Sequence, residues 1–391
     1  DSPGAILIVE FMGDSVEGLP ERVDRLESSL SGNGSAVHVH RALDPAAQGK
    51  IWRLRQAGLG LSMAQVGDTK SHSFVEDTAV APEQLPDYID RFQEILGRHQ
   101  TEAIFYAHAS VGLLHIRPAV NMKTVEGVAA FEAISREVSE LVLEFGGALS
   151  AEHGDGLTRS PYQETMFGPV LDQAFCDLKD CFDPDGILNP NRIVRSPPLT
   201  ESLRFGTAYE TVEVDTVFDF SDFGGLSRAA EQCGGVGTCR KTVAGTMCPS
   251  FMATREETAS TRGRANALRL FISGQMGPEG FTDPSLYPVL DLCFECKACK
   301  TECPTGVDMA RIKSEFLHQH RRAHGVSLRS RVLANAEATA RWGSKLAPAS
   351  NLLVNAPGLR QLSAAFLGLE GGRKLPPFAR QTFLKWWERR G

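Results

Sequence analysis

The sequence lacks several features that would narrow its function at once. No apolar run approaches the roughly 18 residues of a membrane-spanning helix, so no segment is predicted to cross a bilayer. Basic charge is not in excess either, because the net charge of −7 over 391 residues argues against a general nucleic-acid binder. A G-x-G-x-x-G strand–helix unit is also missing, so no dinucleotide-binding fold of that type is predicted. The length leaves room for two or three domains.

Cysteine, by contrast, is plentiful and unevenly placed. Seven of the nine cysteines fall between residues 233 and 303. Four of these, followed directly by Pro304, have the spacing Cys-x2-Cys-x2-Cys-x3-Cys: Cys293, Cys296, Cys299 and Cys303. This is the spacing by which a bacterial-type ferredoxin holds a 4Fe-4S cluster, the alternatives being a zinc knuckle or a disulfide framework. Because cysteines that serve a metal suit a reducing compartment, we expect a cytoplasmic protein.

A second group of cysteines lies upstream of the first. In a two-cluster ferredoxin, the last cysteine of each group serves the other cluster. By this rule one set has four thiolates: Cys248, Cys293, Cys296 and Cys299. The other set has three: Cys233, Cys239 and Cys303. Three thiolates suit a three-iron cluster, or a cubane with one ligand that is not cysteine. The alternative is a single cluster on the four cysteines from 293 to 303.

Histidines and an acidic residue form a second candidate centre. His108 and His115 lie on two successive predicted strands joined by residues 109–112, and Glu152 follows a third predicted strand. Two imidazoles and one carboxylate make a three-ligand set for a divalent metal such as zinc, with coordination positions left open. His153, next to Glu152, is then placed to act as a general base. The alternative is that these are ordinary core or surface residues.

Three basic residues of the same region are candidates for binding a carboxylate substrate. Arg55 and Lys70 precede the histidines, and Arg117 follows His115 by two residues and so shares one face of its strand. Arginine suits bidentate carboxylate binding. The alternative for each of the three is an ordinary surface charge.

The apolar pattern divides the chain into four regions. In residues 1–195, short apolar runs alternate with amphipathic helices, which predicts an α+β domain with helices on one face of a sheet. Its predicted strands are Ile6–Phe11, Ala36–His40, Ala103–Ala107, Leu113–Ile116 and Ala148–Ala151. Its predicted helices cover residues 86–97, 123–145 and 165–182. We expect a linker over 196–224 and a small helical iron–sulfur domain over 225–325, with helices at 261–273 and 308–324.

The fourth region, residues 326–391, is predicted to be helical and is rich in basic residues. It holds eleven Lys/Arg against three Asp/Glu. Such a segment is either a solvated helical tail or a docking face for an acidic partner or a membrane surface. Both ends of the chain look cut, so we expect a fragment of a longer polypeptide whose further domain would follow residue 391.

Six motifs together resemble one family. Three of them are similar to the C-terminal half of FAD-linked oxidases of the D-lactate, glycolate and D-2-hydroxyglutarate dehydrogenase type: His108–Pro118, Glu152–Gly156 and Phe182–Pro190. Three more are similar to the ferredoxin module fused to such oxidases in long bacterial polypeptides: Thr246–Pro249, Ser260–Arg264 and Cys293–Pro304. The resemblance implies an antiparallel-sheet substrate domain followed by an all-α, ferredoxin-like iron–sulfur domain.

The resemblance also implies roles for the residues of the histidine centre. His108, His115 and Glu152 match the family's divalent-metal ligands, and His153 matches the residue that takes the hydroxyl proton of the substrate. The family's usual Gly-Asp-Gly-Asn loop between the two histidines is replaced here by residues 109–113, which leaves open which hydroxy acid is bound.

Other residues match positions around the substrate and the flavin. Arg55 and Lys70 match positions that bind substrate carboxylates, and Arg117 stands where relatives acting on hydroxyglutarate carry asparagine. Asn189 lies in the segment that approaches the FAD. The family's FAD-binding domain is expected to precede residue 1, so the fragment alone is expected to be inactive.

The implied activity is that of a dehydrogenase for a D-2-hydroxy acid, either D-2-hydroxyglutarate or D-lactate. Hydride would pass to FAD, and electrons would pass through the iron–sulfur clusters to a quinone or a protein acceptor. Peripheral association with the inner face of the membrane is a further expectation. The alternative is a non-catalytic iron–sulfur electron-transfer subunit with a vestigial substrate domain.

Overall fold

A computed structural model of the chain describes residues 4–32, 38–368 and 376–390. Its contacts divide the chain into two compact units, which are described separately. The first unit consists of residues 1–209, 231–247 and 298–307. The second consists of residues 210–230, 248–297 and 308–391. The domain boundaries expected from the sequence stay a prediction.

The first unit contains a small antiparallel sheet. Its strands are β1 (Thr69–Ser71), β2 (Thr78–Ala79), β3 (Ala103–His108) and β4 (Leu113–Asn121). β4 pairs with each of the other three strands. β3 and β4 form a hairpin through the turn Ala109–Val111 and Gly112, whose φ of 71° is the left-handed conformation that glycine adopts without strain. The hairpin register sets Tyr106 opposite His115, so the two candidate histidines lie at the same end of the hairpin.

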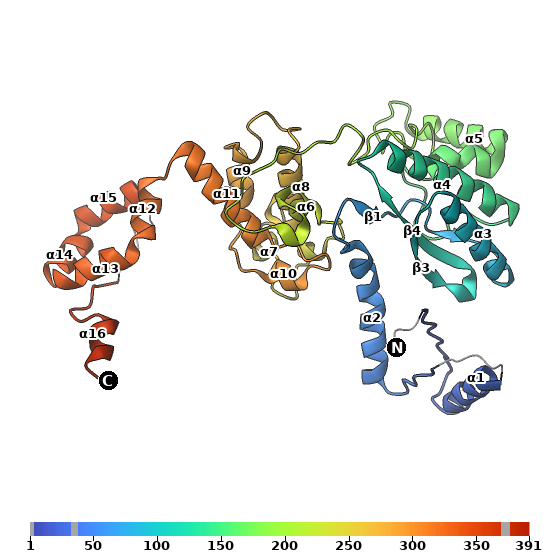
Figure 1. Cartoon of the computed structure of the whole chain (residues 1–391), viewed down its shortest axis with the longest axis horizontal. Coiled ribbons are helices and arrows are strands. Elements are labelled where there is room, and N and C mark those ends of the chain that lie inside the picture. Colours follow the sequence, from blue (N-terminus) through green and yellow to red (C-terminus); the bar gives the residue numbers. More distant parts are fainter. Residues whose placement is uncertain (1–3, 33–37, 369–375, 391) are drawn as a thin grey trace. The chain divides into compact units, whose positions relative to one another are not determined.

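The hydrophobic core lies on one face of β4. α3 (Leu85–Arg98) and α4 (Val125–Glu144) contact each other, and α4 contacts β4 (Figure 1). Successive residues of a strand point to opposite faces, and Leu114, Ile116 and Val120 point into this core, where they are buried. His115 and Arg117 therefore lie on the other face, away from the main core.

The remaining helices of this unit contribute no buried residue to that core, although Met166 packs against it. They are α1 (Leu19–Gly32), α2 (Pro45–Met63), α5 (Gln163–Phe182) and α10 (Ala298–Glu302). Asp44 caps α2 by accepting the backbone N–H groups of the first turn. A Cβ atom at Gly60 would collide with Pro304, and one at Gly234 would collide with Met63. The C-terminal end of α2 thus packs closely against the two cysteine-bearing segments of its own unit.

The structure confirms most of the predicted elements of this region and corrects three strands. β3, β4, α3, α4 and α5 match the predictions. Residues 6–11 form no strand, because an extended run needs a partner strand and none of the described residues pairs with it. Of the predicted strand 36–40, residues 36 and 37 lie outside the described residues, and 38–40 form no strand. Residues 148–151 make a single bridge, from Ala148 to Ala79, rather than a strand.

The second unit contains helices joined by turns and loops, and its described residues form no strand. Its helices are α6 (Leu226–Glu231), α7 (Pro249–Thr254), α8 (Thr261–Ile272), α9 (Leu286–Asp291), α11 (Met309–His324), α12 (Leu328–Ala334), α13 (Ala336–Lys345), α14 (Ala349–Asn355), α15 (Pro357–Leu367) and α16 (Phe383–Glu388). The last residue of α6, Glu231, is counted in the first unit. α8 and α11 confirm the helices predicted at 261–273 and 308–324. The carboxylate of Glu315, which is fully buried, accepts the backbone N–H groups of Val217 and Phe218.

The fold class is therefore α+β, with an antiparallel sheet followed by a helical iron–sulfur region, as the sequence predicted. Within residues 4–32, 38–368 and 376–390, no helix is both long enough and apolar enough to span a bilayer.

Candidate metal and proton-transfer site

Three histidine side chains converge on one carboxylate oxygen in the first unit. The Oε1 atom of Glu152 lies 3.2 Å from Nε2 of His115, 3.4 Å from Nε2 of His153 and 3.7 Å from Nε2 of His108. His108 ends β3, His115 lies on β4, and the other two residues belong to the loop after Ala148. The hairpin and the loop therefore bring together the three ligands and the base that the sequence predicted.

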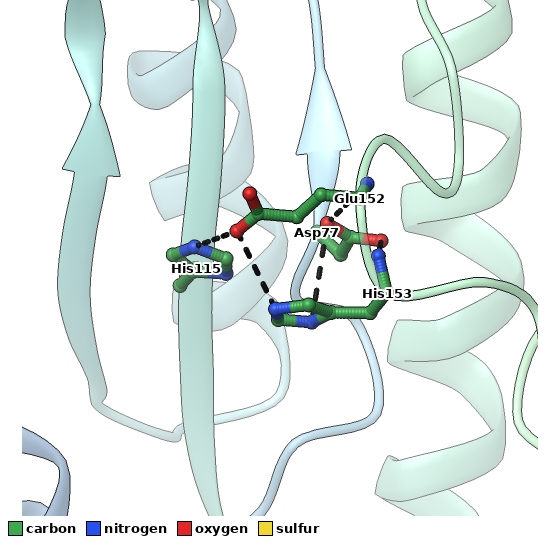
Figure 2. Close-up of side chains that lie close together, drawn as sticks. All are labelled: Asp77, His115, Glu152 and His153. Atoms are coloured by element: carbon green, nitrogen blue, oxygen red, sulfur yellow. Dashed lines mark hydrogen bonds and ion pairs between the residues drawn. The ribbon is translucent and has the colours of Figure 1, made fainter.

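A tighter group of possible ligand atoms includes Asp77 and leaves out His108. One ligand atom each from Asp77, His115, Glu152 and His153 lies within 4.8 Å of all the others, and no other such group occurs among the described residues. Figure 2 shows Glu152 and His153 reaching from the loop toward His115, with Asp77 beside the loop. Nitrogen and oxygen ligands in this number suit a divalent ion such as zinc.

The protonation of His115 favours metal binding. Burial lowers the pKa of His115, although the nearby Glu76 carboxylate opposes this effect. The imidazole is only 6% exposed, and its Nδ1 atom has no hydrogen-bond partner. A neutral imidazole offers one nitrogen lone pair, which is the form a metal ligand must take. The residues present thus fit a divalent ion.

Glu76 lies behind the histidines and contacts three of the predicted site residues: His115, His153 and Arg117. Its Oε1 atom is 3.5 Å from Nδ1 of His153, so the Nε2 atom of that ring faces Glu152 and the cluster. Its Oε2 atom accepts hydrogen bonds from Nε and Nη2 of Arg117, at 3.0 and 2.8 Å. Glu76 itself is buried. Arg117 is therefore at the cluster, as predicted, but its charge is already paired.

The other predicted binding residues differ in their distance from the cluster. Arg55 is adjacent, because its Nη2 atom lies 3.2 Å from Nδ1 of His108 and its guanidinium lies over the Tyr106 ring. Lys70 is paired in register with Val120, so these two side chains lie on the same face of the sheet. That face is opposite to the one that carries His115. The Lys70 ammonium donates to Oε1 of Gln232 at 2.9 Å, and burial lowers its pKa.

Asn189 occupies a strained loop. It is exposed and has a φ of 49°, and three further residues of the same loop that are not glycine also have positive φ: Asn191, Ile193 and Arg195. Left-handed backbone at such residues is uncommon and is concentrated at functional segments. The role of Asn189 toward the flavin stays a prediction.

The cysteines are divided between the two units. Cys233, Cys239, Cys299 and Cys303 belong to the first unit, and Cys248, Cys293 and Cys296 to the second. Burial raises the pKa of Cys233, and the neighbouring Cys303 and Cys239 thiols raise it further. These three are the cysteines that the ferredoxin rule groups together. All seven are free thiols, so no disulfide framework is present among them.

Glu302 holds the cysteine segments of the first unit together. It lies between Cys299 and Cys303 on α10, forms an ion pair with Lys241, and accepts the backbone N–H groups of Thr246 at 2.9 Å and Met247 at 3.2 Å. Hydrogen bonding to Lys241, with support from those amides, lowers the pKa of Glu302 to about 2.

Comparison with known families decides what these two centres belong to. Residues 1–193 match the family described as FAD linked oxidases, C-terminal domain, and residues 229–307 match the 4Fe-4S dicluster domain. The chain joins an FAD-linked oxidase C-terminal domain to a 4Fe-4S dicluster domain. The histidine cluster lies in the oxidase domain, and the seven cysteines lie in the dicluster domain.

Curated relatives match the chain over most of its length or over about half of it. The D-2-hydroxyglutarate dehydrogenase of Pseudomonas putida is 30% identical over 93% of this chain, and that of Escherichia coli is 28% identical over the same share. The chain spans 39% of the length of each of these relatives. Glycolate oxidase subunit GlcD of Bacillus subtilis is 25% identical over 49% of the chain and 40% of its own length. The chain is thus similar to proteins named D-2-hydroxyglutarate dehydrogenase and to a protein named as a glycolate oxidase subunit.

Two residues of the oxidase domain escaped prediction from the sequence: Glu76 and Asp77. Both are buried, and they interrupt an otherwise apolar segment with the buried residues Phe74, Val75 and Val80. Buried carboxylates are rare unless they are hydrogen-bonded or paired. The acidic pair within an apolar run was therefore the feature of the sequence from which these two residues could have been predicted.

Proposed function

We propose that this chain is the substrate-binding and electron-relay part of an FAD-dependent dehydrogenase that oxidises a D-2-hydroxy acid. The observation that carries the proposal is the convergence of three imidazole Nε2 atoms on the Glu152 carboxylate. The relatives that cover both domains are named D-2-hydroxyglutarate dehydrogenase, which supports D-2-hydroxyglutarate over D-lactate as the substrate.

His108, His115 and Glu152 would hold a divalent ion such as zinc. Three protein ligands leave positions open for a substrate hydroxyl and carboxylate. When bound, such an ion supplies charge that lowers the pKa of a coordinated hydroxyl group. The histidines and the carboxylate come from a hairpin and a loop fixed by the fold, so the ligands need little rearrangement to receive the ion.

His153 would take the hydroxyl proton at Nε2. That nitrogen faces the cluster, while Nδ1 faces the Glu76 carboxylate, which favours a proton on Nδ1 and a free lone pair on Nε2. A base that is oriented by a carboxylate on its second nitrogen is a recurring arrangement in proton-transfer sites. The flavin, when bound, supplies the acceptor for the hydride, which leaves the substrate carbon that carries the hydroxyl group.

Arg55 would bind a substrate carboxylate after the metal is loaded. In this structure Arg55 donates to Nδ1 of His108, which places the proton of that neutral ring on Nε2. Binding an ion through Nε2 requires the other tautomer, in which Nδ1 carries the proton and no longer accepts from arginine. The guanidinium is then released toward the substrate. Lys70 and Arg117 remain proposals as further carboxylate-binding residues, together with Asn189 at the flavin.

The two electrons taken from the substrate would leave singly through clusters on the seven cysteines. One cluster would use Cys248, Cys293, Cys296 and Cys299, and the other Cys233, Cys239 and Cys303. The acceptor would be a quinone or a protein.

The basic C-terminal helices expose Trp342 and Trp387, which suits peripheral contact with anionic lipid. Sedimentation with anionic but not zwitterionic vesicles would support that contact, and equal sedimentation would argue against it.

The assignment of His153 is tested in the full-length polypeptide. We expect His153→Ala to abolish flavin reduction by the hydroxy acid while leaving the content of the divalent ion unchanged. His99→Ala is the matched control, because His99 pairs with Glu137 away from the cluster. Rapid-mixing absorbance of the flavin gives the rate, and metal analysis gives the ion. Normal flavin reduction in the His153 variant would refute the assignment.

A second candidate function is supported by the pairing of the predicted carboxylate-binding residues. Arg117 is paired with Glu76, and the Lys70 ammonium is hydrogen-bonded to Gln232, so both groups already have partners within the protein. Such pairing favours an electron-transfer subunit whose substrate site is no longer used. Metal analysis of the full-length protein separates the two candidates. An enzyme contains one divalent ion beyond its cluster iron, whereas a carrier contains iron alone.

A further inference from the structure

Asp77 is the most completely hydrogen-bonded carboxylate around the histidine cluster. It is fully buried. Its Oδ2 atom accepts the hydroxyl of Ser150 at 2.9 Å and the backbone N–H groups of Ala151 at 3.0 Å and His153 at 2.9 Å. Its Oδ1 atom accepts the backbone N–H group of Glu152 at 3.0 Å. Four consecutive residues of one loop thus donate to a single side chain.

This hydrogen bonding replaces a strand. The loop begins where the bridge between Ala148 and Ala79 ends. The N–H groups of Glu152 and His153 turn to the Asp77 side chain, and the N–H group of Ala151 is shared between the side chain and the backbone carbonyl of Asp77. With the backbone amides facing Asp77, the side chains of Glu152 and His153 extend toward His115, as Figure 2 shows. The same contact explains why residues 148–151 form no strand.

Arg159 holds the loop from its other end. Its Nη1 atom donates to the carbonyl of Gly154, and its Nη2 atom donates to the carbonyl of Glu76 and lies 3.6 Å from Oδ2 of Asp77. Burial alone would raise the pKa of Asp77, but hydrogen bonds from His153, Glu152 and Ser150 lower it below its ordinary value. The carboxylate is therefore charged and fixed beside the loop that carries a predicted ligand and the predicted base.

The same count of donors argues against direct coordination by Asp77. An ionised carboxylate offers about four lone-pair sites. Four donors already occupy Asp77, and binding a metal would break some of these hydrogen bonds and release the loop that carries Glu152. His115 and Glu152 have no comparable set of donors at their ligand atoms.

We propose that Asp77 is the positioning residue of the metal site: it places Glu152 and His153 by gripping their backbone and does not itself bind the ion. The proposal rests on the proposed metal site. Residues that orient metal ligands from behind typically change metal affinity by about 10- to 100-fold when they are substituted.

Asp77→Asn is the central test. Asp77 has a φ of 74°, which asparagine tolerates as well as aspartate does, so the backbone at this position is not disturbed. The amide NH₂ group, however, must face at least one N–H donor of the loop. We expect Co²⁺ to bind about 10- to 100-fold more weakly to Asp77→Asn than to the parent chain. The visible spectrum at saturation should stay unchanged, because the ligand atoms are the same.

Three further variants make the outcome specific. Ser150→Ala removes one donor from Asp77 without touching a ligand, and we expect a loss of affinity of about three- to tenfold in the same direction. Glu315→Gln is the matched control, because Glu315 is an equally buried carboxylate that accepts two backbone amides in the second unit. It should lower thermal stability and leave Co²⁺ binding unchanged. His115→Ala should abolish the binding event.

The measurement is a Co²⁺ titration of the full chain after its iron–sulfur clusters have been reconstituted. Only the Co²⁺-binding event that His115→Ala abolishes is assigned to this site. Absence of that event in the parent chain would overturn the proposed metal site. Normal affinity in Asp77→Asn would overturn the positioning role while leaving the site intact. A changed spectrum at saturation in Asp77→Asn, with no effect of Ser150→Ala, would show that Asp77 is itself a ligand.

Discussion

The histidine cluster and the cysteine segments place their ligands by different means. Two of the three histidines, His108 and His115, lie on a hairpin whose opposite face belongs to a core of Phe92, Ile116 and Ile134, all fully buried. The cysteines lie in turns and in or next to short helices: Cys248 is the N-cap of α7, which has six residues, and Cys299 lies on α10, which has five. A fold held by its own core can position ligands before the ion arrives, whereas ligands on short turns depend on the cofactor for their arrangement.

Removing the iron should give the largest effect. We expect anaerobic chelation of iron to remove most of the amide hydrogen-exchange protection in residues 229–307, because cluster binding contributes directly to the stability of that region. α3, α4 and β4 should keep their protection, since a hydrophobic core holds them. Hydrogen-exchange mass spectrometry of the loaded and iron-free chain measures both regions at once. Equal loss of protection in both would contradict the contrast drawn above.

A single cysteine substitution separates the two ways of grouping the thiolates. If Cys248 serves the cluster of the other group, Cys248→Ser should lower the iron content by about one cluster per chain. If one cluster is held by the cysteines from 293 to 303, the iron content should not change. Cys181→Ser is the matched control, because Cys181 is an exposed thiol on α5 of the oxidase domain. Iron and sulfide analysis after anaerobic reconstitution gives the answer.

The sequence predicted the residues of the histidine cluster better than the means by which they are held. His108 and His115 followed from the hairpin, because strand alternation and a short turn bring both rings to one end. The loop after Ala148 was predicted as a strand, because its apolar pattern does not show that the Asp77 side chain takes the amides a neighbouring strand would use. Long-range side-chain-to-backbone contacts of this kind leave little trace in local periodicity.

The Glu302 carboxylate also accepts backbone amides, and its response to acid gives the smallest of the expected effects. Its pKa is lowered from 4.5 to about 2, first by Lys241 and then by the amides of Thr246 and Met247. A carboxyl group with a lowered pKa stabilises the folded state above its ordinary pKa and loses that contribution as the pH falls through the lowered value. The loss therefore falls between about pH 4.5 and 2.

Glu302→Gln should remove this acid-dependent part of the stability. We expect the denaturation midpoints of the cluster-loaded parent and variant chains to differ above pH 4.5 and to converge toward pH 2. The difference should be small, because Glu302 is partly exposed and water screens its ion pair. Glu337→Gln is the matched control: Glu337 pairs with Arg341 on the surface of α13 and should give no such convergence. Parallel midpoints for Glu302→Gln across this pH range would mean that Glu302 does not hold the cysteine segments through its charge.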